Sequence, residues 1–130
     1  MSEQSLYQRL GGKPALEAAV DRFYERVLAP LGLVKLVTRE RMVGFGKSYP
    51  EIWINLRADM TRLPTDNGAH LALRARTTAE IDAFHAAAVA AGAMSESAPS
   101  LRPHDRVRYY AAFVIDADGN RIEAVTFPQE

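Results

Sequence analysis

The feature that most constrains the fold is an order of hydrophobic patterns that occurs twice in 130 residues. A segment with apolar residues at helical spacing ends at a glycine, and short runs with the composition of β-strands follow it. The first helical segment spans about 14–28 and the second begins at Thr77, with Gly32 and Gly92 closing them. This order indicates an α+β protein built from an internal repeat of the βαβββ type.

The first copy predicts one helix and three short strands. Four apolar residues form the stripe that the helix should bury: Leu16, Val20, Phe23 and Val27. Charged residues, glycine and proline separate three β-rich runs, which span 33–38, 42–45 and 51–56. Residues 5–10 have a helical pattern rather than a strand pattern. We therefore expect the first module to lack the opening strand of the repeat.

The second copy carries the complete order of elements. A strand pattern over 70–75 precedes a capping box, in which Thr77 and Glu80 open a helix. The helix should bury Ile81, Phe84 and Ala88. Residues 95–104 are loop-rich and leave room for one short strand. The copy ends in a predicted hairpin, made of 109–115, the turn 116–120, and 121–127.

The length fits one domain with its own core, but not two independent domains of ordinary size. We expect a single domain over 1–130. Its parts would be a helical N-terminal segment (1–32), the rest of the first module (33–66) and the second module (67–130).

The composition excludes several classes of function. Sixteen basic and sixteen acidic residues cancel, which gives no support to electrostatic binding of nucleic acid or of a membrane. The absence of cysteine excludes a disulfide scaffold, a thiolate metal site and a cysteine nucleophile. The N-terminus has no secretory-signal pattern, and no apolar run is long enough to span a bilayer. We expect a cytoplasmic protein without nucleic-acid or membrane partners.

Glu123 is the candidate catalytic residue. In a regular hairpin Ile115 faces Arg121, so Glu123 faces Phe113 and shares a sheet surface with Tyr109. A carboxylate in a mostly apolar strand needs a partner or an opening to water. The residues leave three alternatives open: a metal ligand, a general base, or a residue on an exposed sheet face.

His70 is a second candidate ligand. It begins a strand on its polar side, and imidazole with carboxylate is a common ligand pair for a divalent metal, so His70 and Glu123 are candidate metal ligands. Two ligands alone do not make a site. His85 is expected on a helix surface, whereas His104 lies in a polar loop that either covers a pocket or is simply solvated.

A wider set of side chains has the chemistry to bind a small molecule. Aromatic rings stack on ligands, and arginine pairs with anionic groups. The run 51–56 places Trp53, Asn55 and Arg57 on one side by the period-two rule. The candidate substrate-binding residues are Trp53, Asn55, Arg57, Arg74, Arg102, His104, Tyr109 and Phe113.

Five segments in order carry a resemblance to a known family. They are His70-Leu71-Ala72-Leu73-Arg74-Ala75, Ile81-Asp82-Ala83-Phe84-His85, Leu101-Arg102-Pro103-His104, Tyr109-Tyr110-Ala111-Ala112-Phe113-Val114, and Asp116-Ala117-Asp118-Gly119-Asn120-Arg121-Ile122-Glu123-Ala124-Val125. Together they resemble the vicinal oxygen chelate superfamily, which includes glyoxalase I, extradiol dioxygenases and bleomycin-resistance proteins. The resemblance covers about 23–127.

The resemblance implies two βαβββ modules that form a cupped mixed sheet with helices outside, and it implies a homodimer. Metalloenzymes of this superfamily take ligands from the first and last strands of each module. His70 and Glu123 stand at these positions in the second module, but Trp53 stands at the last-strand position of the first. Half of the implied metal site is therefore missing, which favours the metal-free binding proteins of the superfamily.

Residues 5–28 also resemble the first two helices of a truncated haemoglobin. A haem pocket needs further helices and a proximal histidine, and nothing after Gly32 resembles them. We expect no haem.

Three functions follow from these observations. The first is a glyoxalase/bleomycin-resistance-like protein that binds a small polar or aromatic molecule on the concave sheet face, with no certain cofactor. The alternative is an enzyme that uses one divalent metal ion as a lyase or dioxygenase acting on vicinal oxygens. The third is a degenerate copy with a structural role.

Overall fold

The computed structural model of the chain describes residues 20, 23–57, 61, 64, 66–103 and 106–129. The chain divides into two compact units, Met1–Arg62 and Leu63–Glu130. The predicted boundary between the modules, at residue 66, lies close to this division. Among the described helices, none combines the length and the apolar character needed to cross a bilayer. The single domain and the cytoplasmic location stay predictions.

The first unit begins its described part with a helix. Residues 20 and 23–28 are helical and lead into the 3-10 turn η1 (Ala29–Leu31), which ends at Gly32. Gly32 has φ +79°, a left-handed conformation that favours glycine. Val20 and Val27 are buried as predicted, and Phe23 is partly exposed. Leu16, the predicted helical stretch 5–10 and most of the globin-like segment lie outside the described residues.

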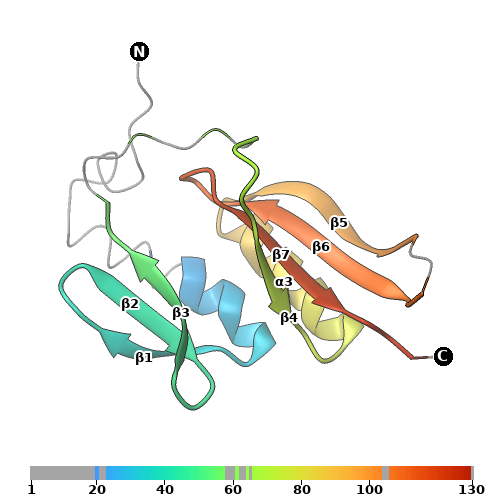
Figure 1. The fold of residues 1–130 in the computed structure, drawn as a ribbon, viewed down its shortest axis with the longest axis horizontal. Coiled ribbons are helices and arrows are strands. Elements are labelled where there is room, and N and C mark those ends of the chain that lie inside the picture. The colour runs from blue at the N-terminus through green and yellow to red at the C-terminus, as the bar shows by residue number, and fades with distance from the viewer. Residues whose placement is uncertain are drawn as a thin grey trace. The chain divides into compact units, whose positions relative to one another are not determined.

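The three β-rich runs of the first unit form the predicted strands, which pair as an antiparallel meander. Strands β1 (Val34–Thr38), β2 (Met42–Gly46) and β3 (Pro50–Asn55) pair in that order (Figure 1). Phe45 in the central strand is fully buried.

The second unit has the complete βαβββ order. Its elements are β4 (Leu71–Arg74), α3 (Thr78–Ala90), β5 (Met94–Arg102), β6 (Tyr109–Ile115) and β7 (Arg121–Thr126). The strands form a mixed sheet in the order β4-β7-β6-β5, in which β4 is parallel to β7 and the other neighbours are antiparallel. The helix α3 crosses one face of this sheet (Figure 1). The predicted α+β class is confirmed.

The start of α3 follows the predicted capping chemistry. The Thr77 hydroxyl accepts a hydrogen bond from the Glu80 amide at 3.2 Å, and the Glu80 carboxylate accepts one from the Arg76 amide at 2.7 Å. The predicted apolar stripe of Ile81, Phe84 and Ala88 is fully buried. The cap and the stripe together fix where the helix begins and which side meets the sheet.

The segment after α3 differs from the prediction. A loop with one short strand was expected over 95–104, but β5 is nine residues long. Its register with β6 shifts between Ser95 and Ser97 and again between Ser97 and Ser100. β5 is an edge strand, and edges tolerate proline and bulges that an interior strand does not, so Pro99 does not end it.

The β6–β7 hairpin is confirmed, and Asp116 organises its turn. The Asp116 Oδ1 accepts hydrogen bonds from the amides of Asp118 and Asn120 at 2.9 and 2.8 Å, and its Oδ2 accepts one from the Asn120 side chain at 2.8 Å. Gly119 has φ +91°. The turn is therefore held by a buried carboxylate.

Candidate functional site

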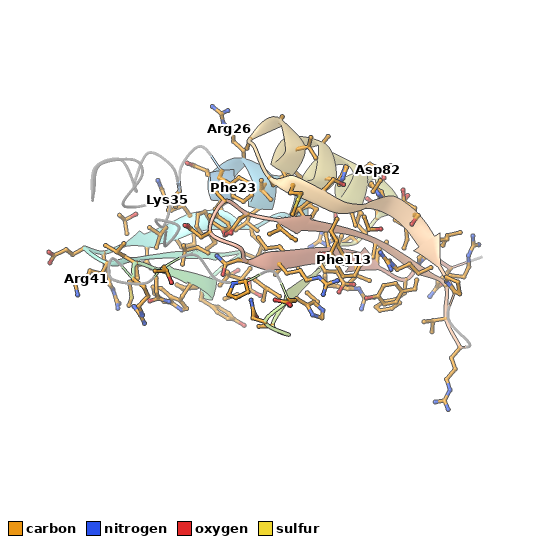
Figure 2. The ribbon with its side chains drawn as sticks, turned by 90° about the horizontal axis from the view of Figure 1, so that it is seen from above. Phe23, Arg26, Lys35, Arg41, Asp82 and Phe113 are labelled. Carbon is orange, nitrogen blue, oxygen red and sulfur yellow. The ribbon has the colours of Figure 1, made fainter. Side chains whose placement is uncertain are left out.

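The four-stranded sheet has two faces of different composition because side chains alternate along each strand. The face against α3 is aliphatic, with buried Ala112, Val114, Ile122 and Ala124. Tyr110 belongs to this face, since its hydroxyl donates to Asp82 Oδ1 of α3 at 2.6 Å; Figure 2 shows Asp82 on the helix side. The opposite face carries Tyr109, Phe113 and Glu123, and we call it the polar sheet face.

The strand register is the one predicted. Ile115 pairs with Arg121, and Phe113 pairs with Glu123. On its other side Glu123 pairs with Ala72 of β4. Glu123 therefore occupies a central strand, with neighbours on both sides.

The Glu123 carboxylate is buried and has a partner for each oxygen. The residue is only 2% exposed. His70 Nε2 lies 3.2 Å from Glu123 Oε1, and the Tyr109 hydroxyl donates to Glu123 Oε2. The alternative of an exposed surface residue is therefore wrong, because the neighbouring side chains cover the carboxylate and supply the partners that its burial requires.

The surroundings of Tyr109 keep its hydroxyl protonated, so it remains a hydrogen-bond donor. Burial, the hydrogen bond to Glu123 and the charge of that carboxylate raise the pKa of Tyr109 to about 12, whereas the charge of Arg102 opposes the rise. The phenol therefore stays protonated at neutral pH and holds Glu123 in place.

Aromatic rings and arginines surround this pair. The Phe113 ring centroid lies 6.2 Å from the His70 ring, 4.4 Å from the Arg102 guanidinium carbon and 5.5 Å from that of Arg121. The Phe127 ring lies edge-on to Tyr109 at 5.3 Å, and the Arg74 guanidinium lies 4.3 Å from the Phe127 centroid. The polar sheet face thus combines ring surfaces with cationic groups.

Four predicted site residues lie on the polar sheet face, together with the predicted pair His70 and Glu123. These four are Arg74, Arg102, Tyr109 and Phe113. The sequence analysis missed Phe127 and Arg121, although Arg121 lies two residues before Glu123 and Phe127 four residues after it, so both share its face. That spacing was the signal available to find them.

Three other predicted site residues belong to the first unit. Trp53 on β3 of the first unit is 38% exposed, pairs with Gly44 and has the Arg39 guanidinium 5.4 Å from its ring. Asn55 ends β3 and is exposed, and Arg57 donates to its neighbour's carbonyl at 3.0 Å. His104 lies outside the described residues.

His85 was expected on a helix surface, and it is half-buried with a partner. Its Nε2 lies 2.7 Å from the Ser95 hydroxyl oxygen, so it links α3 to the start of β5. This contact lies on the side of the sheet that faces α3, and not on the polar sheet face.

The donor set for a metal ion is incomplete in the described residues. The imidazole of His70 and the carboxylate of Glu123 are suitable donors and lie side by side. Within the described ranges, no group of three or more His, Cys, Asp or Glu side chains is arranged to hold an ion. A tight site uses three or four protein ligands, so these residues do not fit a complete metal centre.

Several solved structures of other proteins have a fold similar to that of this chain. The chain is similar to a glyoxalase/bleomycin resistance protein from Albidiferax ferrireducens T118, with 28% identity, a TM-score of 0.72, and coverage of 83% of this chain and 88% of the other. It is also similar to a glyoxalase/bleomycin resistance protein/dioxygenase from Alicyclobacillus acidocaldarius, with 18% identity, a TM-score of 0.61, and coverage of 87% and 83%. A glyoxalase family protein from Enterococcus faecalis shows 23% identity and a TM-score of 0.56, with coverage of 84% and 87%.

The chain therefore has the fold of the glyoxalase/bleomycin-resistance proteins. These neighbours are consistent with the vicinal oxygen chelate superfamily, and the resemblance predicted from the sequence is confirmed. No family sequence model and no curated protein sequence matches the chain.

Proposed function

We propose that the chain is a glyoxalase/bleomycin-resistance-like protein that binds a small polar or aromatic molecule on the polar sheet face. The observation that carries this proposal is the arrangement around Phe113. One ring has an imidazole and two guanidinium groups around it, next to a carboxylate whose oxygens both have partners. The fold it shares with glyoxalase/bleomycin-resistance proteins supports the same conclusion.

The chemistry of this face favours recognition of a planar ligand. Phe113 and Phe127 offer ring faces and edges, on which an aromatic molecule can stack. Arginine offers a planar fork of donors to oxygen atoms of the ligand. Since His70 and Tyr109 already satisfy Glu123, the carboxylate orients its neighbours without the help of an ion.

Ligand-observed NMR on the full chain tests the proposal. The probes are benzoate and benzamide, and the protein is dialysed against a chelator before use. We expect saturation transfer to at least one probe in wild-type protein, and its loss in Phe113→Ala and in the volume-conserving Phe113→Leu. Val89→Ala is the control, because Val89 is exposed on α3. Absence of transfer, or transfer that both Phe113 variants retain, would contradict the proposal.

One observation favours the alternative of a divalent-metal enzyme of the lyase or dioxygenase type. His70 and Glu123 present two donor atoms 3.2 Å apart. Elemental analysis of protein purified without chelator checks it: one equivalent of zinc, nickel, iron or manganese that His70→Ala removes would favour the enzyme. The expected homodimer stays a prediction, and sedimentation velocity checks it.

A further inference from the structure

Two buried donors stand out on the polar sheet face. In the described part of the chain, the Nε atoms of Arg102 and Arg121 are the buried side-chain nitrogens that lack a hydrogen-bond partner. A buried N–H without an acceptor is costly, and native proteins rarely keep one without a reason. Both atoms belong to arginines beside the same Phe113 ring.

Each arginine is held in place by a residue of β5. Arg102 donates from one terminal nitrogen to the Ser97 hydroxyl at 2.7 Å, and Arg121 pairs with the Glu96 carboxylate. These contacts use one edge of each guanidinium and hold it beside the ring. They leave the Nε–H of both arginines as donors with fixed positions.

The two arginines differ in their balance of charge. Glu96 balances the charge of Arg121. Within the described ranges Arg102 has a neutral hydroxyl as its side-chain partner and no carboxylate. Glu123, the buried acidic group of the same face, is already held by Tyr109 and His70. Arg102 is thus a half-buried cation whose natural complement is an external anion.

We propose that the ligand of the polar sheet face is a small aromatic carboxylate, whose oxyanion accepts hydrogen bonds from Arg102, with Arg121 as the weaker second donor. The ring of the ligand packs on the aromatic side chains, and its carboxylate balances the charge of Arg102. A shift of the side chains that cover the buried Nε–H groups would let the same carboxylate supply the acceptor that they lack. This inference deepens the proposed function and rests on it. It excludes cationic aromatic molecules as preferred ligands of this face.

Arg74 provides a matched comparison on the same face. Like Arg102 it lies over an aromatic ring, 4.3 Å from the Phe127 centroid, but it is exposed and has no buried donor without a partner. Removing its charge changes the general field of the face in the same way as removing that of Arg102. A difference between the two variants therefore reports the specific hydrogen bonds.

Calorimetric titration of the full chain with benzoate, benzamide and benzylammonium tests the inference. We expect wild-type protein to bind benzoate about ten-fold or more tighter than benzamide, since one charge-assisted bond is sufficient for such a factor. Benzylammonium should bind most weakly. R102Q should bring the affinity for benzoate to the level of that for benzamide, and R121Q and R74Q should each cause a smaller loss.

The variant R102K covers the case in which R102Q does not fold. Lysine keeps the charge but lacks the planar fork, so R102K should fold, as circular dichroism will show, and still lose most of the preference for benzoate. Equal affinity of wild-type protein for benzoate and benzamide would overturn this inference and leave the proposed function standing. If neither benzoate nor benzamide binds, both this inference and the proposed function are overturned. An equal loss of benzoate affinity in R74Q and R102Q would also overturn this inference, because the loss would then come from the positive charge of the face and not from specific hydrogen bonds.

Discussion

The last strands of the two units show how far two copies of one pattern have diverged. In β7 the central residue is Glu123, which pairs with Phe113 and is buried beneath its own partners. In β3 the corresponding residue is Trp53, which pairs with Gly44 and remains partly exposed. One strand presents a carboxylate opposite an aromatic ring, and the other presents an aromatic ring opposite a glycine.

The two positions therefore have different physical requirements. A buried carboxylate needs polar partners, so the second unit has His70 and Tyr109 around it. A large ring needs space, and Gly44 supplies it: a Cβ at that position would lie 3.0 Å from the Trp53 ring and 3.1 Å from Pro50. At this position the first unit therefore packs an aromatic ring against a glycine, whereas the second unit holds a carboxylate among polar partners.

The largest effect is expected from Trp53→Ala. The buried part of a tryptophan ring on a sheet stabilises by about 2–3 kcal/mol, from the apolar area it removes from water. Urea unfolding followed by circular dichroism measures the loss. Tyr49→Ala is the control, because Tyr49 is an aromatic residue of the same unit that is 71% exposed. An equal cost for both variants would mean that Trp53 does not pack as described.

Tyr109→Phe tests the polar partner of Glu123. A hydrogen bond to a charged group contributes about 2 kcal/mol, so we expect a loss of this size at neutral pH, measured by the same unfolding experiment. Combining Tyr109→Phe with Glu123→Gln should cost less than the sum of the single changes, since both remove one interaction. Strict additivity would show that the two side chains do not interact.

The raised pKa of Tyr109 predicts that the stability of the folded chain depends on pH. The pKa of Tyr109 is raised from 10.0 to about 12 in the folded chain, so the folded state holds a proton that the unfolded state loses. The contribution of Tyr109 to stability is thus complete below pH 10 and is lost as the pH rises towards 12. Tyr109→Phe should show a shallower fall over this range. Tyrosinate absorbance checks the titration, compared between the two proteins because Asp82 also raises the pKa of Tyr110.

Gly44→Ala tests the space that the first unit keeps for its ring. Overpacking of one methyl group at 3.0 Å should cost about 1 kcal/mol and shift the fluorescence of Trp53, the single tryptophan. In the background of Trp53→Ala the same change should be close to neutral. A cost that persists without the ring would assign the strain to Pro50 instead.

The smallest effect is expected from Arg39→Gln. The Arg39 guanidinium lies 5.4 Å from the Trp53 centroid at an exposed site, where a cation–π contact contributes about 0.5 kcal/mol. Added salt should change this contribution little, because a guanidinium also stacks through its planar face. Arg41→Gln, on the same exposed turn, serves as the control in thermal unfolding.

Local chemistry made much of this fold predictable from the sequence. The capping box at Thr77, the turn at Asp116 and the alternation that pairs Phe113 with Glu123 each depend on residues close in the chain. They were predicted because hydrogen bonds of caps and turns have a fixed spacing. The closeness of His70 and Glu123 follows from a parallel pairing of β4 with β7, and before the structure only the family resemblance implied that these two residues lie together.

Other features could not be predicted because they arise from the sheet as a whole. The nine residues of β5 include serines and a proline, and only their place at an edge lets them form a strand. The position of Arg102 over Phe113 depends on a hydrogen bond to Ser97, between two register shifts. No simple alternation describes such a strand.

The turn at Asp116 has a consequence for which side of the sheet carries Glu123. Side chains alternate along β7, so a slip of one residue in the hairpin would turn Glu123 towards α3 and bring Ile122 and Ala124 to the opposite side. The Asp116 carboxylate binds two amides and one side chain of the turn, and it thereby fixes the count of residues between the strands. A single acid in the hairpin turn thus determines which face of the sheet each side chain of β7 occupies.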